Sequence, residues 1–277
     1  MYHDLYALKP QFLKPSPELQ HLISQYVVLK IGPEDLCIHD KFIPDGHAAL
    51  VFNFNSSQAS IHPGKNEVLP DFFLVVPRIQ PVKIEVIAPS ESLVVVCKAS
   101  VLSRVFEVNF HESFETPHMI IDLFRGFPMF MHLSSIKDMT ERIAYFEAYI
   151  LHHFAVSDYL PDEVDRLYTE VIGSGGMISI SETISLLKTG TRTFRKKFLK
   201  RVGINPKGLA RIVRVNNVWK TLSLAQSHDL QDAVFVGHFF DQSHLTRDFR
   251  TIVGETPGAF FSRNLENVEL LSGKRFD

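Results

Sequence analysis

The spacing of apolar residues changes near residue 100, and this change is the feature that most constrains the fold. Before it, four segments rich in Val, Ile and Phe are bounded by Pro, Gly, Ser and Asn, which is typical of strands joined by turns. They are HAALVFNFN (47–55), FFLVVPRI (72–79), VKIEVIAP (82–89) and SLVVVCKAS (92–100). After it, apolar residues recur at helical spacing. We therefore expect an α+β protein, with a β-rich sandwich or barrel of roughly seven or eight strands followed by an all-helical domain.

Chain length allows two hydrophobic cores, because the 277 residues exceed the roughly 100 to 150 of a common domain. Apolar spacing predicts a short amphipathic helix from Pro17 to Leu29 and a connecting helix from Ile136 to Phe154. We expect a β-rich domain, a helical linker, a helical domain and a tail, with the boundaries 1–125, 126–159, 160–265 and 266–277.

The helical domain contains six segments with helical spacing, and tight turns join four of them in two pairs. Thr189 and Gly190 separate the first pair, and residues 238–240 separate the second, which predicts two helix-turn-helix motifs about 50 residues apart. Ser181 is expected to cap the second helix, and Asp241 or Ser243 the last. The helices are expected over 162–172, 181–187, from near Arg192 to just before Gly203, 206–224, 230–237 and 242–253.

Basic residues are concentrated in one stretch of this domain. Residues 188–220 hold eleven Lys or Arg and no Asp or Glu, although the whole chain has a formal charge of −2. A helical surface this cationic is typical of proteins that neutralise phosphates. Clustered Lys and Arg can also form a merely solvated face, or a face that meets an acidic protein partner. The presence of two paired-helix motifs favours nucleic acid.

Two segments of the helical domain follow known patterns. FFDQSHLTRDFRTIVGETPGAFF (239–261) is similar to the signature GF-x-D-x-SHF-x-R-x-F followed by G-x-TP, and RTFRKKFLKRVGINPKGLARIVR (192–214) to R-x-L-x-R-x-F followed by G-x-SP. These are the patterns of the AraC/XylS family of bacterial transcription regulators, which this region resembles. The first half resembles, more weakly, the β-rich domain of some members through IPDGHAALVFNF (43–54). The resemblance implies two helix-turn-helix modules that bind DNA, and a cupin-like domain for sensing or dimerisation.

The resemblance also assigns base contacts to two recognition helices. The positions are Arg192, Arg195 and Lys196 in the first module and Gln242, Ser243, His244 and Arg247 in the second. We expect phosphate contacts from Lys197, Lys200 and Arg250. Arg247 has an alternative role as a structural ion-pair partner of Asp241 or Asp248, and His244 could equally contact a base, contact a phosphate or cap the helix. Core positions, rather than base stacking, are expected for Phe194, Phe198, Phe239 and Phe249.

The chain departs from the family pattern at the turns. Gly190 stands where a capping Ser is usual, and Thr183 and Ile184 replace a customary Leu-Ala pair. His238 stands where the turn glycine is usual, and histidine adopts positive φ only at some energetic cost.

Catalytic and metal chemistry have little support in the sequence. The motifs GxSxG, HExxH and the P-loop are absent, and the two cysteines form no CxxC pair. The adjacent pair His152–His153 is poorly placed to chelate, and NFHESFETPH (109–118), with His111, Glu112, Glu115 and His118, lacks a recognisable cupin metal motif. We expect no metal, no cofactor and no enzymatic activity.

These observations together predict a cytoplasmic, sequence-specific transcription regulator whose partner is double-stranded DNA. A small-molecule effector, RNA polymerase and a second copy of the chain are further partners that the sequence leaves open. No membrane partner is expected, because there is neither a signal-peptide pattern nor an apolar run of about 18 residues. The alternative functions are a metal-dependent, enzyme-like β-domain fused to a DNA-targeting module, and a protein-interaction module.

Overall fold

The first half of the molecule is built from two antiparallel sheets. A computed structural model describes residues 10–32, 37–54, 59–61, 70–87, 89–112, 128–225 and 229–264. One sheet has five strands, in the order β1 (Gln11–Leu13), β2 (Ile23–Ile31), β8 (Ser90–Cys97), β4 (Ala48–Asn53) and β6 (Phe72–Val75). The other has three, in the order β3 (Cys37–Phe42), β7 (Val82–Ile87) and β5 (Ala59–Ile61). The expected β-rich domain is confirmed, and each of the four predicted strand segments contains a strand.

The amphipathic helix expected from Pro17 to Leu29 is wrong. Only a single 3₁₀ turn, η2 (Pro17–Leu19), forms there, and β2 begins at Ile23. The residues Leu19, Leu22 and Tyr26 are buried as a helix would have buried them. The β-branched residues that follow favour an extended chain, and pairing with β8, for example Val27 opposite Val94, stabilises it.

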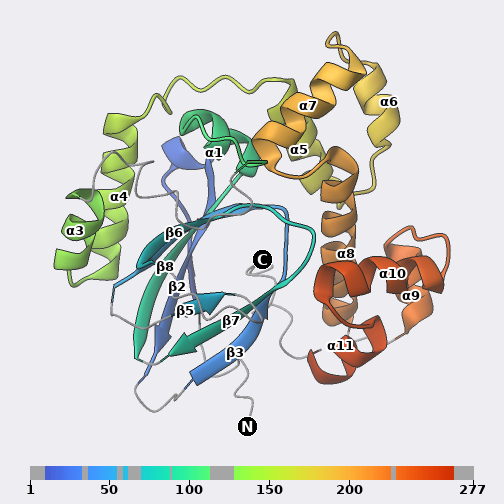
Figure 1. Ribbon diagram of the computed structural model, residues 1–277, viewed down its shortest axis with the longest axis horizontal. Helices are drawn as coiled ribbons and strands as arrows, with labels where there is room; N and C mark the ends of the chain where they lie inside the picture. The colour runs from blue at the N-terminus through green and yellow to red at the C-terminus, as the bar shows by residue number, and fades with distance from the viewer. Residues whose placement is uncertain are drawn as a thin grey trace.

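Helices cover the sheets on two sides, with α3 (Pro128–Ser135) and α4 (Met139–His153) on one side and α5 to α11 on the other (Figure 1). The helix α4 corresponds to the predicted connecting helix. Its Phe146 packs edge-on against Phe52 of β4, with ring centroids 5.5 Å apart, and against Tyr26 of β2. The short helix α1 (Ala99–Val105) follows β8 directly and lies beside the helical half.

Within its described residues, the helical half contains the six predicted helices and one more. They are α5 (Glu163–Gly173), α6 (Ile180–Ser185), α7 (Thr191–Val202), α8 (Pro206–Ala225), α9 (Leu230–Val236), α10 (Gln242–Val253) and the additional α11 (Pro257–Asn264). The N-cap of α6 is Ser179, so the prediction of Ser181 is wrong. The apolar stripe of α8 is buried as expected. Its Trp219 packs against Phe260 of α11, with ring centroids 5.2 Å apart.

The two halves are in direct contact. The turn before β4 lies against α5 and α8, because the Tyr168 hydroxyl donates to the carbonyl of Gly46 at 3.0 Å and the Asn216 amide donates to the carbonyl of Pro44 at 2.9 Å. Gly46 has φ +92°, and a Cβ there would lie 2.6 Å from Leu209 of α8. The turn from Pro44 to Gly46 therefore forms part of the interface between the sheets and the helices.

Candidate nucleic-acid interface

The first recognition helix, α7, has one buried face and one cationic face. Phe194 and Phe198 are fully buried, four residues apart, as the sequence predicted. Gly190 is the N-cap, and Gly203 ends the helix in the left-handed conformation at φ +81°. The exposed residues include every predicted contact of this module, namely Arg192, Arg195, Lys196, Lys197 and Lys200.

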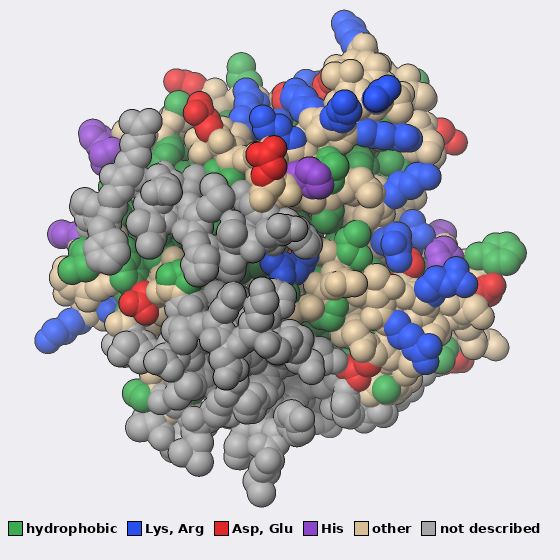
Figure 2. Space-filling view, in the orientation of Figure 1, with side chains coloured by type: hydrophobic (Ala, Val, Ile, Leu, Met, Phe, Trp, Pro, Cys, Tyr) green, Lys and Arg blue, Asp and Glu red, His purple; other side chains and the backbone are tan. Residues whose placement is uncertain are grey.

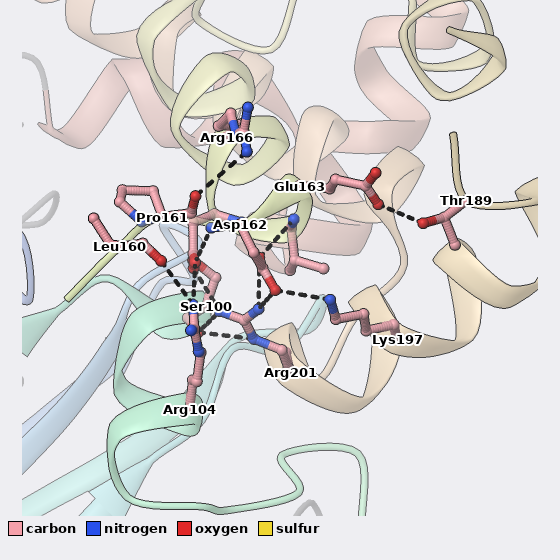
Figure 3. Close-up of polar contacts among 12 residues, drawn as sticks. Ser100, Arg104, Leu160, Pro161, Asp162, Glu163, Arg166, Thr189, Lys197 and Arg201 are labelled. Atoms are coloured by element: carbon pink, nitrogen blue, oxygen red, sulfur yellow. Dashed lines mark hydrogen bonds and ion pairs between the residues drawn. The ribbon is translucent and has the colours of Figure 1, made fainter. Parts of the chain in front are cut away.

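One cation of α7 points inward instead and holds the helix against its neighbours (Figure 3). Arg201 is 8 % exposed, and its guanidinium donates to both carboxylate oxygens of Asp162, each at 2.7 Å, and to Asp165 at 2.5 Å. It also donates to the carbonyl of Ser100 in α1, at 2.5 and 3.1 Å. Arg201 therefore joins the recognition helix to α5 and to the β-rich half at one point.

Asp162 occupies a central place in this cluster. It caps α5 by accepting from the backbone of Val164 and Asp165, in a capping box. Burial raises the pKa of the Asp162 carboxyl, but Lys197 and Arg201 oppose burial and hold that pKa well below its ordinary value. Lys197, predicted to hold phosphate, forms a 2.8 Å ion pair with Asp162 in this structure.

The second recognition helix, α10, repeats the arrangement of α7. Leu245 and Phe249 are fully buried, and Asp241 caps the helix by accepting from the backbone nitrogen of His244 at 2.7 Å. Of the two caps expected, Asp241 is the one observed. A shallow, open hollow of about 580 Å³ follows the outer face, and its lining consists of Gln242, Ser243, Thr246, Arg247, Arg250 and Thr251.

The inner side of α10 carries a buried carboxylate. Asp248 is 2 % exposed and accepts from Nε and Nη2 of Arg211 in α8, at 3.0 and 2.7 Å. Among the residues that the structure describes, Arg247 forms no ion pair, so the alternative role expected for it belongs to Arg211. His244 is half-buried, and its Nε2 lies 3.7 Å from Asp248.

The turn before α10 contains a histidine with positive φ, a conformation that costs histidine some energy. His238 has φ +49°, in the left-handed region that glycine adopts easily. Gly237 is buried, and a Cβ there would collide with the ring of Phe239. The glycine one position early therefore serves close packing, while the histidine makes the turn.

The cationic sides of the two modules share one side of the molecule. Figure 2 shows Lys and Arg side chains gathered along the edge over which Figure 1 places α7, α8 and α10. Between the modules, α8 contacts both, through the packing of its apolar stripe and through Arg211. Proteins that insert helices into the major groove use such a surface to hold the phosphate backbone.

Clusters of metal-binding side chains are not found in the part of the chain that the structure describes. No group of three or more His, Cys, Asp or Glu side chains there could hold a metal ion. His111 and Glu112 lie in a described turn, whereas Glu115 and His118 lie outside the described residues. None of the described helices combines the length and the apolar character needed to cross a membrane.

Comparison with known proteins identifies the helical region. Solved structures of ToxT from Vibrio cholerae are similar to the chain: one from strain O395 at TM-score 0.46 and 10 % identity, over 88 % of this chain and 98 % of that one. Another, bound to an unsaturated fatty acid, has TM-score 0.43 and 12 % identity, over 91 % and 98 %. No curated protein sequence matches. A family model described as a helix-turn-helix domain matches residues 185–263, which include α7 to α10. Residues 185–263 thus match a helix-turn-helix domain.

Proposed function

We propose that the chain is a sequence-specific, DNA-binding transcription regulator whose helices α7 and α10 enter successive segments of the major groove. Such segments lie about 34 Å apart on one side of a duplex. The observation that carries this proposal is the repeated arrangement of the two helices. Each buries an apolar face, contacts α8, and leaves polar and cationic residues exposed on one side of the molecule.

Two kinds of contact are proposed for the outer faces of α7 and α10. Arginine forms paired hydrogen bonds with guanine and glutamine with adenine, whereas lysine acts on phosphate as a point charge. Base reading is proposed for Arg192, Arg195, Lys196, Gln242, Ser243, His244 and Arg247. Phosphate contacts are proposed for Lys197, Lys200 and Arg250, with Lys197 leaving Asp162 when a phosphate is near.

The test compares binding to duplexes selected from a random pool with binding to unselected ones. Arg247→Ala is expected to relax specificity at one base position by about 1 to 3 kcal/mol. Lys200→Ala should weaken binding to all sequences alike and reduce the salt slope by about 1. Lys137→Ala, at an exposed site between α3 and α4, is the matched control and should change neither the specificity nor the salt slope. Equal affinity of the unmodified protein for selected and random duplexes would overturn the proposal.

The β-rich half, proposed as the domain over 1–125 with a linker over 126–159, would bias DNA binding through a small ligand or a second copy of the chain. Its contacts with α5, α7 and α8 support such a role, because a change in the sheets would be transmitted directly to the first recognition helix. Thermal shift against a metabolite panel, and sedimentation with and without DNA, distinguish a ligand from assembly. We also propose that the regulator is located in the cytoplasm and contacts RNA polymerase.

A further inference from the structure

The buried carboxylate of α10 is only partly satisfied by Arg211. Both hydrogen bonds from Arg211 reach the same oxygen, Oδ1 of Asp248. The other oxygen, Oδ2, is buried and has no hydrogen-bond partner among the described residues. A buried carboxylate oxygen without a donor is destabilising, so a donor close to it would be stabilised there.

His244 is the residue that faces this oxygen. It lies one helical turn before Asp248, and its Nε2 is 3.7 Å from Oδ2, which is within ion-pair distance but too long for a hydrogen bond. The ring also meets Phe239 edge-on, with centroids 5.3 Å apart and an interplanar angle of 85°. Since only one ring nitrogen can face Asp248, the other, Nδ1, is left for a partner outside the described chain.

His244 also borders the exposed face of α10. It is three residues before Arg247, which lines the outer hollow, and four before Asp248, which is buried, so it lies between the two on the helix surface. Its side chain is 40 % exposed. In the proposed complex this position lies where the N-terminal turn of the recognition helix approaches the groove.

Charged groups of both signs lie around His244. Asp248 is on the same helix, and two guanidiniums of α8 lie close by: Arg211, paired with Asp248, and Arg214, which lies 5.6 Å from the centre of the Phe239 ring. The cap Asp241 adds a carboxylate that accepts from the backbone of His244. A third cation in this cluster becomes favourable when DNA brings anionic phosphates to it.

We propose that Asp248, anchored by Arg211, is a positioning residue that turns Nε2 of His244 inward and leaves Nδ1 to donate to an acceptor on DNA once the ring takes up a proton. Binding of DNA by the second module is then linked to uptake of a proton from solvent. The acceptor is an oxygen or nitrogen of DNA, either on a phosphate or on the edge of a purine. This inference rests on the proposed function and adds to it a proton linkage and a residue outside the predicted contacts.

The experiment measures the Kd of the full chain at pH 6.0 and pH 8.0, at fixed ionic strength, on a selected and on a random duplex. If a proton is taken up when DNA binds, binding is tighter at the lower pH, and the unmodified protein should bind about fivefold tighter at pH 6.0 than at pH 8.0. Both His244→Gln and Asp248→Asn should reduce this ratio to near one. His238→Asn, in the exposed turn before α10, removes a nearby histidine while keeping a residue suited to positive φ. This control should retain the ratio of Kd values between the two pH values.

The outcomes separate this inference from the proposed function. A gain on both duplexes indicates a phosphate acceptor, and a gain on the selected duplex alone indicates a base. A pH-independent Kd on a duplex that is bound specifically, or a His244→Gln variant that keeps the pH effect, would overturn the inference and leave the proposed function intact. Loss of specificity at both pH values in the unmodified protein would overturn the proposed function itself. Circular dichroism checks that Asp248→Asn is folded. If Asp248→Asn is unfolded, the pH dependence of the Kd of His244→Gln alone decides whether the inference holds.

Discussion

Replacing Arg201 by methionine tests how the first recognition helix is held. Methionine keeps much of the side-chain volume and removes the guanidinium, so it breaks the bonds to Asp162, Asp165 and the carbonyl of Ser100 together. The side chain of Asp165 is only 3 % exposed and loses its ion pair of 2.5 Å. Asp165 keeps a longer, 3.6 Å ion pair with the partly exposed Arg104, and Asp162 keeps Lys197, so the charges stay partly compensated. Removing one partner of a buried ion pair is strongly destabilising, and we expect a loss of about 3 kcal/mol in the free energy of unfolding.

The assay is urea unfolding followed by far-UV circular dichroism. Lys200→Met is the matched control, because Lys200 is the preceding residue of the same helix and its side chain is exposed. We expect the control to change the free energy of unfolding by less than about 0.5 kcal/mol. In a melting experiment the Arg201 variant should lose about 10 °C, since 1 kcal/mol corresponds to roughly 2 to 4 °C in chains of 150 to 250 residues.

A second substitution separates the loss of charge pairing from the loss of packing. Asp165→Asn should be costly in the unmodified protein and much less costly, or restorative, in the Arg201→Met background, because the unpaired charge is then removed. The reasoning is refuted if Arg201→Met unfolds like Lys200→Met. It is also refuted if Asp165→Asn costs the same in both backgrounds.

Three further predictions concern pH, backbone conformation and a thiol. Because the pKa of Asp162 is lower in the folded chain than in the unfolded one, its contribution is complete above its ordinary value near 3.9 and is lost as the pH falls toward the folded value. The urea midpoint should decline below about pH 4, and less steeply in Asp162→Asn. Gly176→Ala should cost about 2 kcal/mol or more, because φ is +78° and the new Cβ would collide with the carbonyl of Ala210, whereas Gly173→Ala meets nothing within 4 Å and should be neutral or stabilising by up to about 1 kcal/mol. Burial raises the pKa of the Cys97 thiol, so peptide mapping should show slow alkylation of Cys97 in the native chain and fast alkylation in urea; equal rates would contradict its burial.

The recognition helices could be located from sequence because the signals for them are local. Apolar residues four apart, a capping residue and a terminal glycine lie within one helix or directly beside it, and they identified α7 and α10 with Phe194, Phe249, Asp241 and Gly203 in their expected roles. The stretch from Pro17 to Leu29 carried equally regular apolar spacing and was mispredicted. There the choice between helix and strand depended on the partner strand β8, which is about 65 residues away.

The roles of the basic residues show the limit of sequence reading. Residues 188–220 have no acidic residue, so no neighbour in this stretch marks any of its cations as part of a structural ion pair. Arg201 and Arg211 instead point inward to Asp162 and Asp248, whose positions in the chain are 39 and 37 residues away. No spacing rule connects residues so far apart, so sequence could not distinguish these two arginines from their exposed neighbours.

By itself, the sequence determined the order of β and helical regions, the two helix-turn-helix motifs and the cationic character of their surface, because each depends on neighbouring residues. The tertiary structure alone decided which cations face solvent and which anchor the recognition helices, and that the first of these helices is bonded to the β-rich half. Those features depend on which distant carboxylates and carbonyls folding brings within hydrogen-bond distance, since burial makes an unpaired charge too costly to leave in place.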